Sequence, residues 1–201
     1  MNDSLLISAY FPPISYFSII KYSKHIIIEA MENYQRQTIG NRCHIQTSNG
    51  LQTLSIPIKK DKDKLITSVK IDYSTPWNYK HAHAIRSAYG KTAFFPYYYD
   101  ELVSPLFEKH ETLFELNQVI IEKCIKFLQL NKSLQLTKYY SIKHDDLNDL
   151  RNDFSKKKPP FTKNYQQKTY IQTFSDRYPF MSDLSILDLL FNTGLEANLY
   201  L

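Results

Sequence analysis

The first thirty residues change from a strand-like to a helix-like hydrophobic pattern and back again. Residues 5–11 form an apolar run that stops at Pro12-Pro13. Residues 14–22 then carry apolar side chains at helical spacing, and residues 25–30 form a second run rich in isoleucine. A strand, a short helix and a strand in so short a stretch predict a βαβ unit. The fold class is therefore α/β, with a mixed α+β arrangement as the alternative.

A hairpin is predicted next, because Asn49-Gly50 lies between two strand-like segments, 43–47 and 51–56. Leu54, Ile56 and Ile58 alternate with other residues, as in a half-buried strand. Strand-like patterns also occur farther along the chain. The additional strands predicted on this basis are 65–73, 134–140 and 170–174.

Four later stretches predict helices, each with a start or stop signal. Thr112 and Glu115 form a capping box ahead of the clearest amphipathic pattern. Gly90 and Gly194 follow two other stretches, where a left-handed residue commonly ends a helix, and Ser182-Asp183 supplies a cap. The predicted helices are 77–89, 99–108, 113–128 and 184–193.

A chain of 201 residues with these elements fits one domain, residues 1–201, with a small mixed sheet and four to six helices. Residues 143–167 carry scattered charge and Pro159-Pro160, so we predict a surface helix and a mobile segment there. The N-terminus has no basic region or cleavage site of a signal peptide. No apolar run approaches the roughly 18 residues of a membrane-spanning helix. We expect a cytoplasmic protein without membrane insertion.

The net charge of +5 is interspersed with acidic residues rather than concentrated. It suits a mildly basic soluble protein, or one with an anionic ligand such as a sugar phosphate or nucleotide-sugar. No basic helix or aromatic-basic strand motif indicates nucleic-acid binding. The histidines show no metal-ligand spacing, so no metal site is predicted. The sequence leaves the cofactor and the oligomeric state open.

Several short motifs resemble, in their order and spacing, those of the WbqC-like family of bacterial proteins. The resemblance covers most of the chain and is weakest over 134–167. It implies a role near surface-polysaccharide biosynthesis. Ile39-Gly40 and His83 depart from the family pattern, which more usually has basic residues there, so an anion would be held differently. The matching motifs are Tyr10-Phe11-Pro12-Pro13, Glu32-Asn33-Tyr34, Asn41-Arg42-Cys43, Asn49-Gly50, Leu54-Ser55-Ile56-Pro57, Trp77 with His81, Ser87-Ala88-Tyr89-Gly90, and residues 184–194.

The polar stretch 32–50 is the part of the chain most suited to contact a ligand. Arg42 offers a planar guanidinium for phosphate or carboxylate, and Asn41 can bind a sugar hydroxyl. Alternatively, Arg42 ties the hairpin together through backbone carbonyls. Cys43 is a candidate nucleophile beside Arg42, but strand alternation directs the two to opposite faces and favours a buried structural thiol. Tyr34, Trp77, Tyr89 and Asn192 complete the predicted substrate contacts.

His81 is the candidate general acid or base, since it lies four residues after Trp77 on one helical face. A partly buried imidazole there would titrate near neutrality; the alternative is a structural histidine at the edge of the core. Asp188 lies in a polar stripe on an apolar helix. The stripe is either the solvent face or a buried row in which Asp188 orients His81 or Arg42.

Two functions are compatible with these residues. One is an enzyme that transfers an acyl, aminoacyl or other small group onto an activated amino-sugar. The other is a non-catalytic carbohydrate- or protein-binding assembly protein, for which the aromatic run at 94–99 would supply a surface. Convergence of His81, Arg42 and Asp188 on one cleft would support the enzyme.

Overall fold

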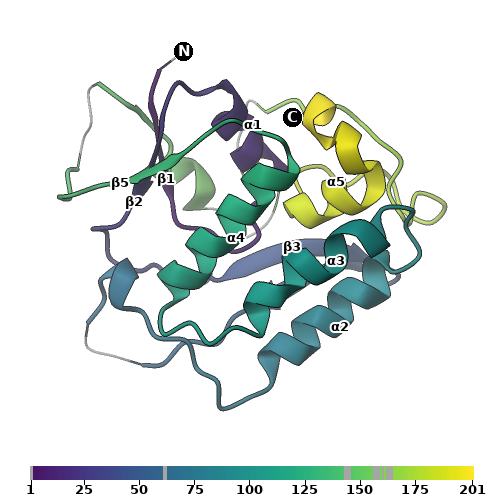
Figure 1. Cartoon of the computed structure of the whole chain (residues 1–201), viewed down its shortest axis with the longest axis horizontal. Coiled ribbons are helices and arrows are strands. Elements are labelled where there is room, and N and C mark those ends of the chain that lie inside the picture. The colour runs from purple at the N-terminus through teal and green to yellow at the C-terminus, as the bar shows by residue number, and fades with distance from the viewer. Residues whose placement is uncertain (1, 61–62, 143–145, 156–158, 160, 162–164) are drawn as a thin grey trace.

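The computed structural model describes residues 2–60, 63–142, 146–155, 159, 161 and 165–201. These residues form a single α/β domain with two sheets and five α-helices (Figure 1). The strands are β1 (Ser4–Ile7), β2 (Ile26–Glu29), β3 (Arg42–Thr47), β4 (Gly50–Ser55), β5 (Leu134–Leu136) and β6 (Asn148–Asp149). The helices are α1 (Ile14–Tyr22), α2 (Trp77–Tyr89), α3 (Phe95–Val103), α4 (Leu113–Phe127) and α5 (Ile186–Thr193).

The larger sheet is parallel and has the order β5-β2-β1-β6. Strand β1 is fully buried, as expected for a central strand that is covered on both faces. The βαβ start is confirmed: β1, α1 and β2 follow one another, with Ser4 opposite Ile26. Strand β5 pairs with the outer side of β2, and β6 pairs with the outer side of β1.

The predicted hairpin is also confirmed, and β3 and β4 form an antiparallel sheet of their own. Thr47 pairs with Gly50, and Gly50 takes a φ of +93° that a glycine adopts readily. The hairpin packs against α2 and α5, while α3 packs against α4 (Figure 1). The capping box of Thr112 and Glu115 starts α4 as predicted.

Two predicted strands are wrong. Residues 65–73 form a short 3-10 helix, Ile66–Ser68, and make only isolated bridges such as Ile58 with Ile71. Residues 170–174 are irregular, because the Gln172 side chain bonds Met181 and Asp188 where a strand would pair through its backbone. Both stretches alternate in hydrophobicity, but among the described residues no strand runs beside them to form a ladder.

Helices α3 and α5 begin at residues other than predicted, and the cap at the end of α2 also differs. Helix α3 begins at Phe95, because Pro96 is tolerated in a first turn, and ends at Val103. Ser185, rather than Ser182-Asp183, caps α5 through a bond from the backbone N–H of Leu187. Gly90 has a φ of −59°, so α2 ends without the left-handed residue that was predicted. Of the predicted segment 143–167, residues 143–145, 156–158, 160 and 162–164 lie outside the described residues.

The segment before α5 is joined to the first turn of α1. The backbone N–H of Ile14 donates to Leu184 O at 3.0 Å, and that of Ser15 donates to Asp183 Oδ1 at 2.9 Å. In return, Ile186 N donates to Pro12 O at 2.9 Å. The amide donors that begin both helices are therefore satisfied by protein groups rather than by solvent.

Gly194→Ala is predicted to lower the free energy of unfolding by about 2–4 kcal/mol. Gly194 has a φ of +57°, and an added Cβ would overlap the Phe94 ring. Urea denaturation measures the effect. Gly40→Ala is the matched control, since its Cβ would meet only Thr38 Oγ1 at 3.3 Å and Ser8 O at 3.5 Å. Equal losses in the two variants would contradict the explanation.

Candidate functional site

A narrow cleft lies at the carboxyl ends of β1 and β6, where the sheet order changes direction. The chain leaves β1 toward β2 on one side, and β6 returns on the other. Ligands of open parallel sheets commonly bind outside the strand ends at such a point. We call this the switch-point cleft; its volume of about 40 Å³ admits one small group. It is lined by Ile7, Ser8, Glu32, Tyr34, Gln35, Thr38, Gly40, Ile66, Arg151 and Asn152.

Arg151 organises one wall of this cleft. Its guanidinium donates to Glu29 Oε2 at 2.8 Å, to Asp149 Oδ2 at 2.6 Å and to Ser141 O at 2.9 Å. Glu29 is fully buried and also accepts from Thr137 Oγ1 at 2.6 Å. Two carboxylates share one cation here, so the cluster carries one excess negative charge. It joins β6 to β2 and leaves the guanidinium occupied by protein partners.

Glu32 lies beside this cluster. Burial raises the pKa of its carboxyl to about 7; the negative charges of Glu29 and Asp149 add to the rise, and Arg151 opposes it. Within the described residues, no hydrogen bond reaches the Glu32 carboxyl. Because its pKa lies near neutrality, this group can both donate and accept a proton under ordinary conditions.

A buried asparagine sets the orientation of a hydroxyl on the opposite wall. Asn117 is fully buried, and its Nδ2 donates to Gly40 O at 2.8 Å and to Ser8 Oγ at 3.1 Å. A carbonyl can only accept, so the amide nitrogen is assigned unambiguously. Ser8 Oγ therefore accepts from Asn117. Its own proton has no protein acceptor among the described residues and is available to a group in the cleft.

Tyr34 connects the switch-point cleft to a second, basic cleft of about 330 Å³. Burial raises the pKa of the Tyr34 hydroxyl to about 12, although the positive charges of Arg42 and Arg36 oppose the rise. Four cations and one carboxylate line the basic cleft, which suits an anionic group. Its lining residues are Tyr34, Arg36, Ile58, Lys59, Lys60, Asp63, Lys64 and Val69.

Asn41 and Arg42 lie at the base of the hairpin. Asn41 is buried, and its Nδ2 donates to Ile56 O at 2.9 Å, so this amide joins the two strands. Arg42 is half-buried, and its Nε has no hydrogen-bond partner in the part of the chain that the structure describes. Its charge acts on Tyr34, which places it near the basic cleft. Cys43 is a buried free thiol whose pKa is raised by burial, in agreement with a structural role.

His81 does pack beside Trp77 as predicted, with ring centroids 5.3 Å apart. However, the imidazole is only 5% exposed, and its Nδ1 lies 2.9 Å from the Tyr10 hydroxyl. Burial lowers its pKa to about 4, while a hydrogen bond with the Ser55 backbone opposes the shift. The expected titration near neutrality is therefore wrong, and His81 is neutral at pH 7.

Asp188 is fully buried, as the second interpretation of its polar stripe required. Its carboxylate accepts from Tyr89 Oη at 3.0 Å, from Tyr170 Oη at 2.6 Å and from Gln172 Nε2 at 3.0 Å. Burial raises the pKa of Asp188, and these three bonds oppose the rise. Its backbone carbonyl accepts from Asn192 Nδ2 at 2.7 Å.

Within the described residues, no hydrogen bond joins Asp188 to His81 or Arg42. None of these three side chains lines the switch-point cleft or the basic cleft, and the convergence that would support an enzyme stays a prediction. Of the predicted contacts, only Tyr34 lines the switch-point cleft. The chemical roles assigned to His81, Asp188, Trp77, Tyr89 and Asn192 stay predictions.

The sequence analysis missed Glu29, Asp149, Arg151 and the role of Glu32. A signal was present, because Glu29 and Asp149 are charged residues at the ends of two strands. Glu32 was noted only as part of a family motif. Its raised pKa comes first from burial and then from Glu29 and Asp149, and a linear pattern shows neither the burial nor the approach of Asp149 from more than 100 positions away.

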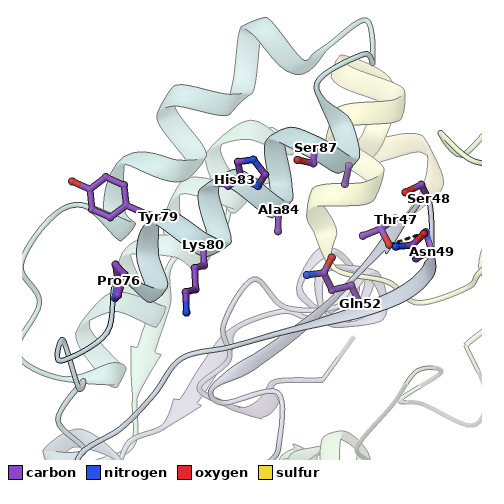
Figure 2. A pocket seen from close by; sticks show the side chains of 11 residues that line it. Thr47, Ser48, Asn49, Gln52, Pro76, Tyr79, Lys80, His83, Ala84 and Ser87 are labelled. Carbon is purple, nitrogen blue, oxygen red and sulfur yellow. Dashed lines mark hydrogen bonds between the residues drawn. The ribbon is translucent and has the colours of Figure 1, made fainter.

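A larger groove of about 710 Å³ lies between α2 and the turn of the hairpin (Figure 2). It shares no lining residue with the switch-point cleft. Size alone favours this groove as the principal site. The switch-point cleft is smaller, but it contains a carboxyl group with a pKa suited to proton transfer.

Glu32→Gln is predicted to remove a pH dependence of stability. The ordinary pKa of 4.5 rises to about 7 in the fold, so the native state binds this proton more tightly. Wild-type stability should then fall relative to the variant by about 1–3 kcal/mol as the pH rises through this window. Urea unfolding at pH 5 and pH 8 measures the difference. Glu122→Gln, on the exposed side of α4, should show no such pH-dependent change; an equal change in both variants would refute the assignment.

Comparison with known proteins identifies the family. The model of the WbqC-like protein family matches residues 8–158. An uncharacterized protein of Mycobacterium tuberculosis, Rv1507c, is 27% identical over 220 residues, which cover 96% of this chain and 94% of that protein. No solved structure matches. No helix in the described part of the chain is long and apolar enough to cross a membrane. The chain belongs to the WbqC-like protein family.

Proposed function

We propose that this protein transfers an acyl, aminoacyl or other small group onto an anionic sugar derivative, such as a nucleotide-sugar or sugar phosphate. The observation that carries this proposal is the unpaired Glu32 carboxyl, whose pKa is about 7, in a cleft at the strand ends. The resemblance to the WbqC-like family motivates the pathway, which is assembly of a bacterial surface polysaccharide in the cytoplasm.

In this proposal, the basic cleft binds the ligand and the switch-point cleft holds the reacting group. Lys59, Lys64 and Arg36 hold the phosphate groups of the ligand in the basic cleft. The switch-point cleft is too small for a sugar and receives only the reacting group. Tyr34, which lines both clefts, directs the ligand from one to the other.

Glu32 acts as the general base and then as the general acid. Its carboxylate removes a proton from the sugar amino or hydroxyl group as that group attacks the carbonyl of the donor. The new bond forms between nucleophile and carbonyl carbon, the bond to the leaving group breaks, and Glu32 returns the proton to the leaving group. The Ser8 hydroxyl donates a hydrogen bond to the carbonyl oxygen as negative charge develops there.

A second candidate is a non-catalytic carbohydrate- or protein-binding assembly protein. The aromatic run at 94–99 gives it little support, because Phe95, Tyr98 and Tyr99 are buried in the core. Tyr97 is 75% exposed and Tyr139 is 72% exposed, and these rings favour a binding surface. In this case the basic cleft would hold the ligand without turnover.

A thermal-shift screen tests the anionic ligand. The probes are nucleotide-sugars, sugar phosphates, nucleotides and acyl carriers. We expect one anionic class to raise the melting temperature of the wild type and of Glu32→Gln, but not that of Lys59→Gln/Lys64→Gln. Lys123→Gln/Lys126→Gln, on α4, removes the same two positive charges and is the control, which should respond as the wild type does. A shift that survives in the double variant would remove the basic cleft from the proposal, and a flat screen would favour a protein partner.

Turnover with the ligand found in that screen tests the chemistry. We expect Glu32→Gln to lower kcat by about 10²–10⁴-fold without weakening ligand binding. In the wild type, kcat should rise with pH through about 7, as a general base loses its proton. His81→Gln separates the two assignments of the base. Full activity in Glu32→Gln together with inactivity in a folded His81→Gln would return the chemistry to His81.

A further inference from the structure

The groove between α2 and the hairpin differs in chemical character from the two clefts. Figure 2 shows Lys80 and Ala84 directed from α2 toward the hairpin, and Gln52 directed from β4 toward the helix. Lys80, Ala84 and Ala88 are spaced by four, so they follow one line along α2. The two alanines leave open space where longer side chains would touch the hairpin. The volume of about 710 Å³ lies within the usual range of ligand sites.

Several polar side chains of the groove have no protein partner among the described residues. Within the described residues, no hydrogen bond or ion pair is made by the side chains of Gln52, Lys80, His83 or Ser87. Thr47 is different, because its hydroxyl donates to Gly50 O at 3.0 Å and holds the hairpin turn. An amide, an ammonium group, an imidazole and a hydroxyl therefore face a ligand with their hydrogen-bonding capacity unused.

The charge of the groove selects among polar ligands. Lys80 supplies a positive charge, and no Asp or Glu is among the described residues that line the groove. The amide of Gln52 can donate and accept at once, which matches neighbouring hydroxyl groups. This combination favours a ligand with many hydroxyls and a negative charge, and it disfavours a polyamine or a basic peptide.

One end of the groove carries an aromatic surface. Tyr79 is 66% exposed and packs edge-on against Phe107, itself 47% exposed, with ring centroids 5.0 Å apart. Two exposed rings in contact form an apolar surface that is unfavourable to leave in contact with water. The flat, apolar side of a pyranose ring can stack there while its hydroxyls remain solvated.

We infer that this groove binds an acidic oligosaccharide, with Gln52 reading hydroxyls, Lys80 pairing with a carboxylate, and Tyr79 stacking on a sugar ring. The site goes beyond the proposed function, because the groove shares no residue with either cleft of the proposed active site. An acidic glycan bound there would remain attached during chemistry at the distant cleft.

Titration with trigalacturonate and with its fully methyl-esterified form tests the site. The two probes share one carbon skeleton and differ in charge. We expect trigalacturonate to shift the amide NMR signals of α2 and the hairpin turn, and Lys80→Gln to weaken its binding about 5-fold. Lys80→Gln should leave the ester unaffected, whereas Gln52→Ala should weaken both probes.

Lys64→Gln is the control, since Lys64 has the same charge and lies in the basic cleft. It should not change trigalacturonate binding, whereas the sugar phosphates of the proposed function should respond to it and not to Lys80→Gln. All substituted residues are exposed, so the variants should fold, and circular dichroism verifies this. Signal shifts outside α2 and the hairpin, equal binding by Lys80→Gln, or no shift at 10 mM trigalacturonate would each overturn the inference.

Discussion

A single guanidinium determines the character of the sheet's carboxyl end. Arg151 is nearly buried and is paired with both Glu29 and Asp149. Removing one partner of such a buried pair leaves an uncompensated charge, so the three residues act as a unit. The unit holds β6 beside β1 and fixes the wall of the cleft. Its excess negative charge, added to burial, keeps the Glu32 pKa near 7. Structure and chemistry at this end thus depend on the same ion cluster.

The turn from β1 into α1 shows why an anion would bind elsewhere. A helix that follows a parallel strand often holds phosphate on its first amides. Here Leu184 O and Asp183 Oδ1 accept from the amides of Ile14 and Ser15. Phe11 takes a φ of +37°, and its carbonyl accepts from Ser185 Oγ at 2.9 Å. The contact between the starts of α1 and α5 therefore also stabilises a strained backbone. In the proposed function, the anion is held instead by Arg36 and the lysines of the basic cleft beyond Tyr34.

Local patterns predicted the parts of the fold that local physics determines. The βαβ start, the hairpin and α4 each combine a hydrophobic period with a turn or cap that one stretch of sequence contains. Residues 65–73 and 170–174 alternate equally well, but a strand needs a partner that the pattern does not specify. The candidate site likewise combines features that local sequence determines with features that distant residues determine. The sequence left open whether Asp188 is buried and placed His81 only partly in the core, because Tyr10 and Tyr170, which bond these side chains, lie 71 and 18 positions away. The pKa of Glu32 likewise depends on burial and on Asp149, which is distant in sequence.

The polar stretch 32–50 explains how one segment serves two concave surfaces. Its first residues, Glu32 and Tyr34, line the switch-point cleft, and residues 47–49 line the groove beside α2. Between them, Cys43 and Ile45 are buried. A fully polar segment would have no buried side chains to anchor it, and a fully apolar one would have no hydrogen-bonding groups for a ligand. Burial of the middle therefore fixes the positions of both ends, and the polar groups offered at the two ends differ: a carboxyl group at one, and the Ser48 hydroxyl and Asn49 amide at the other.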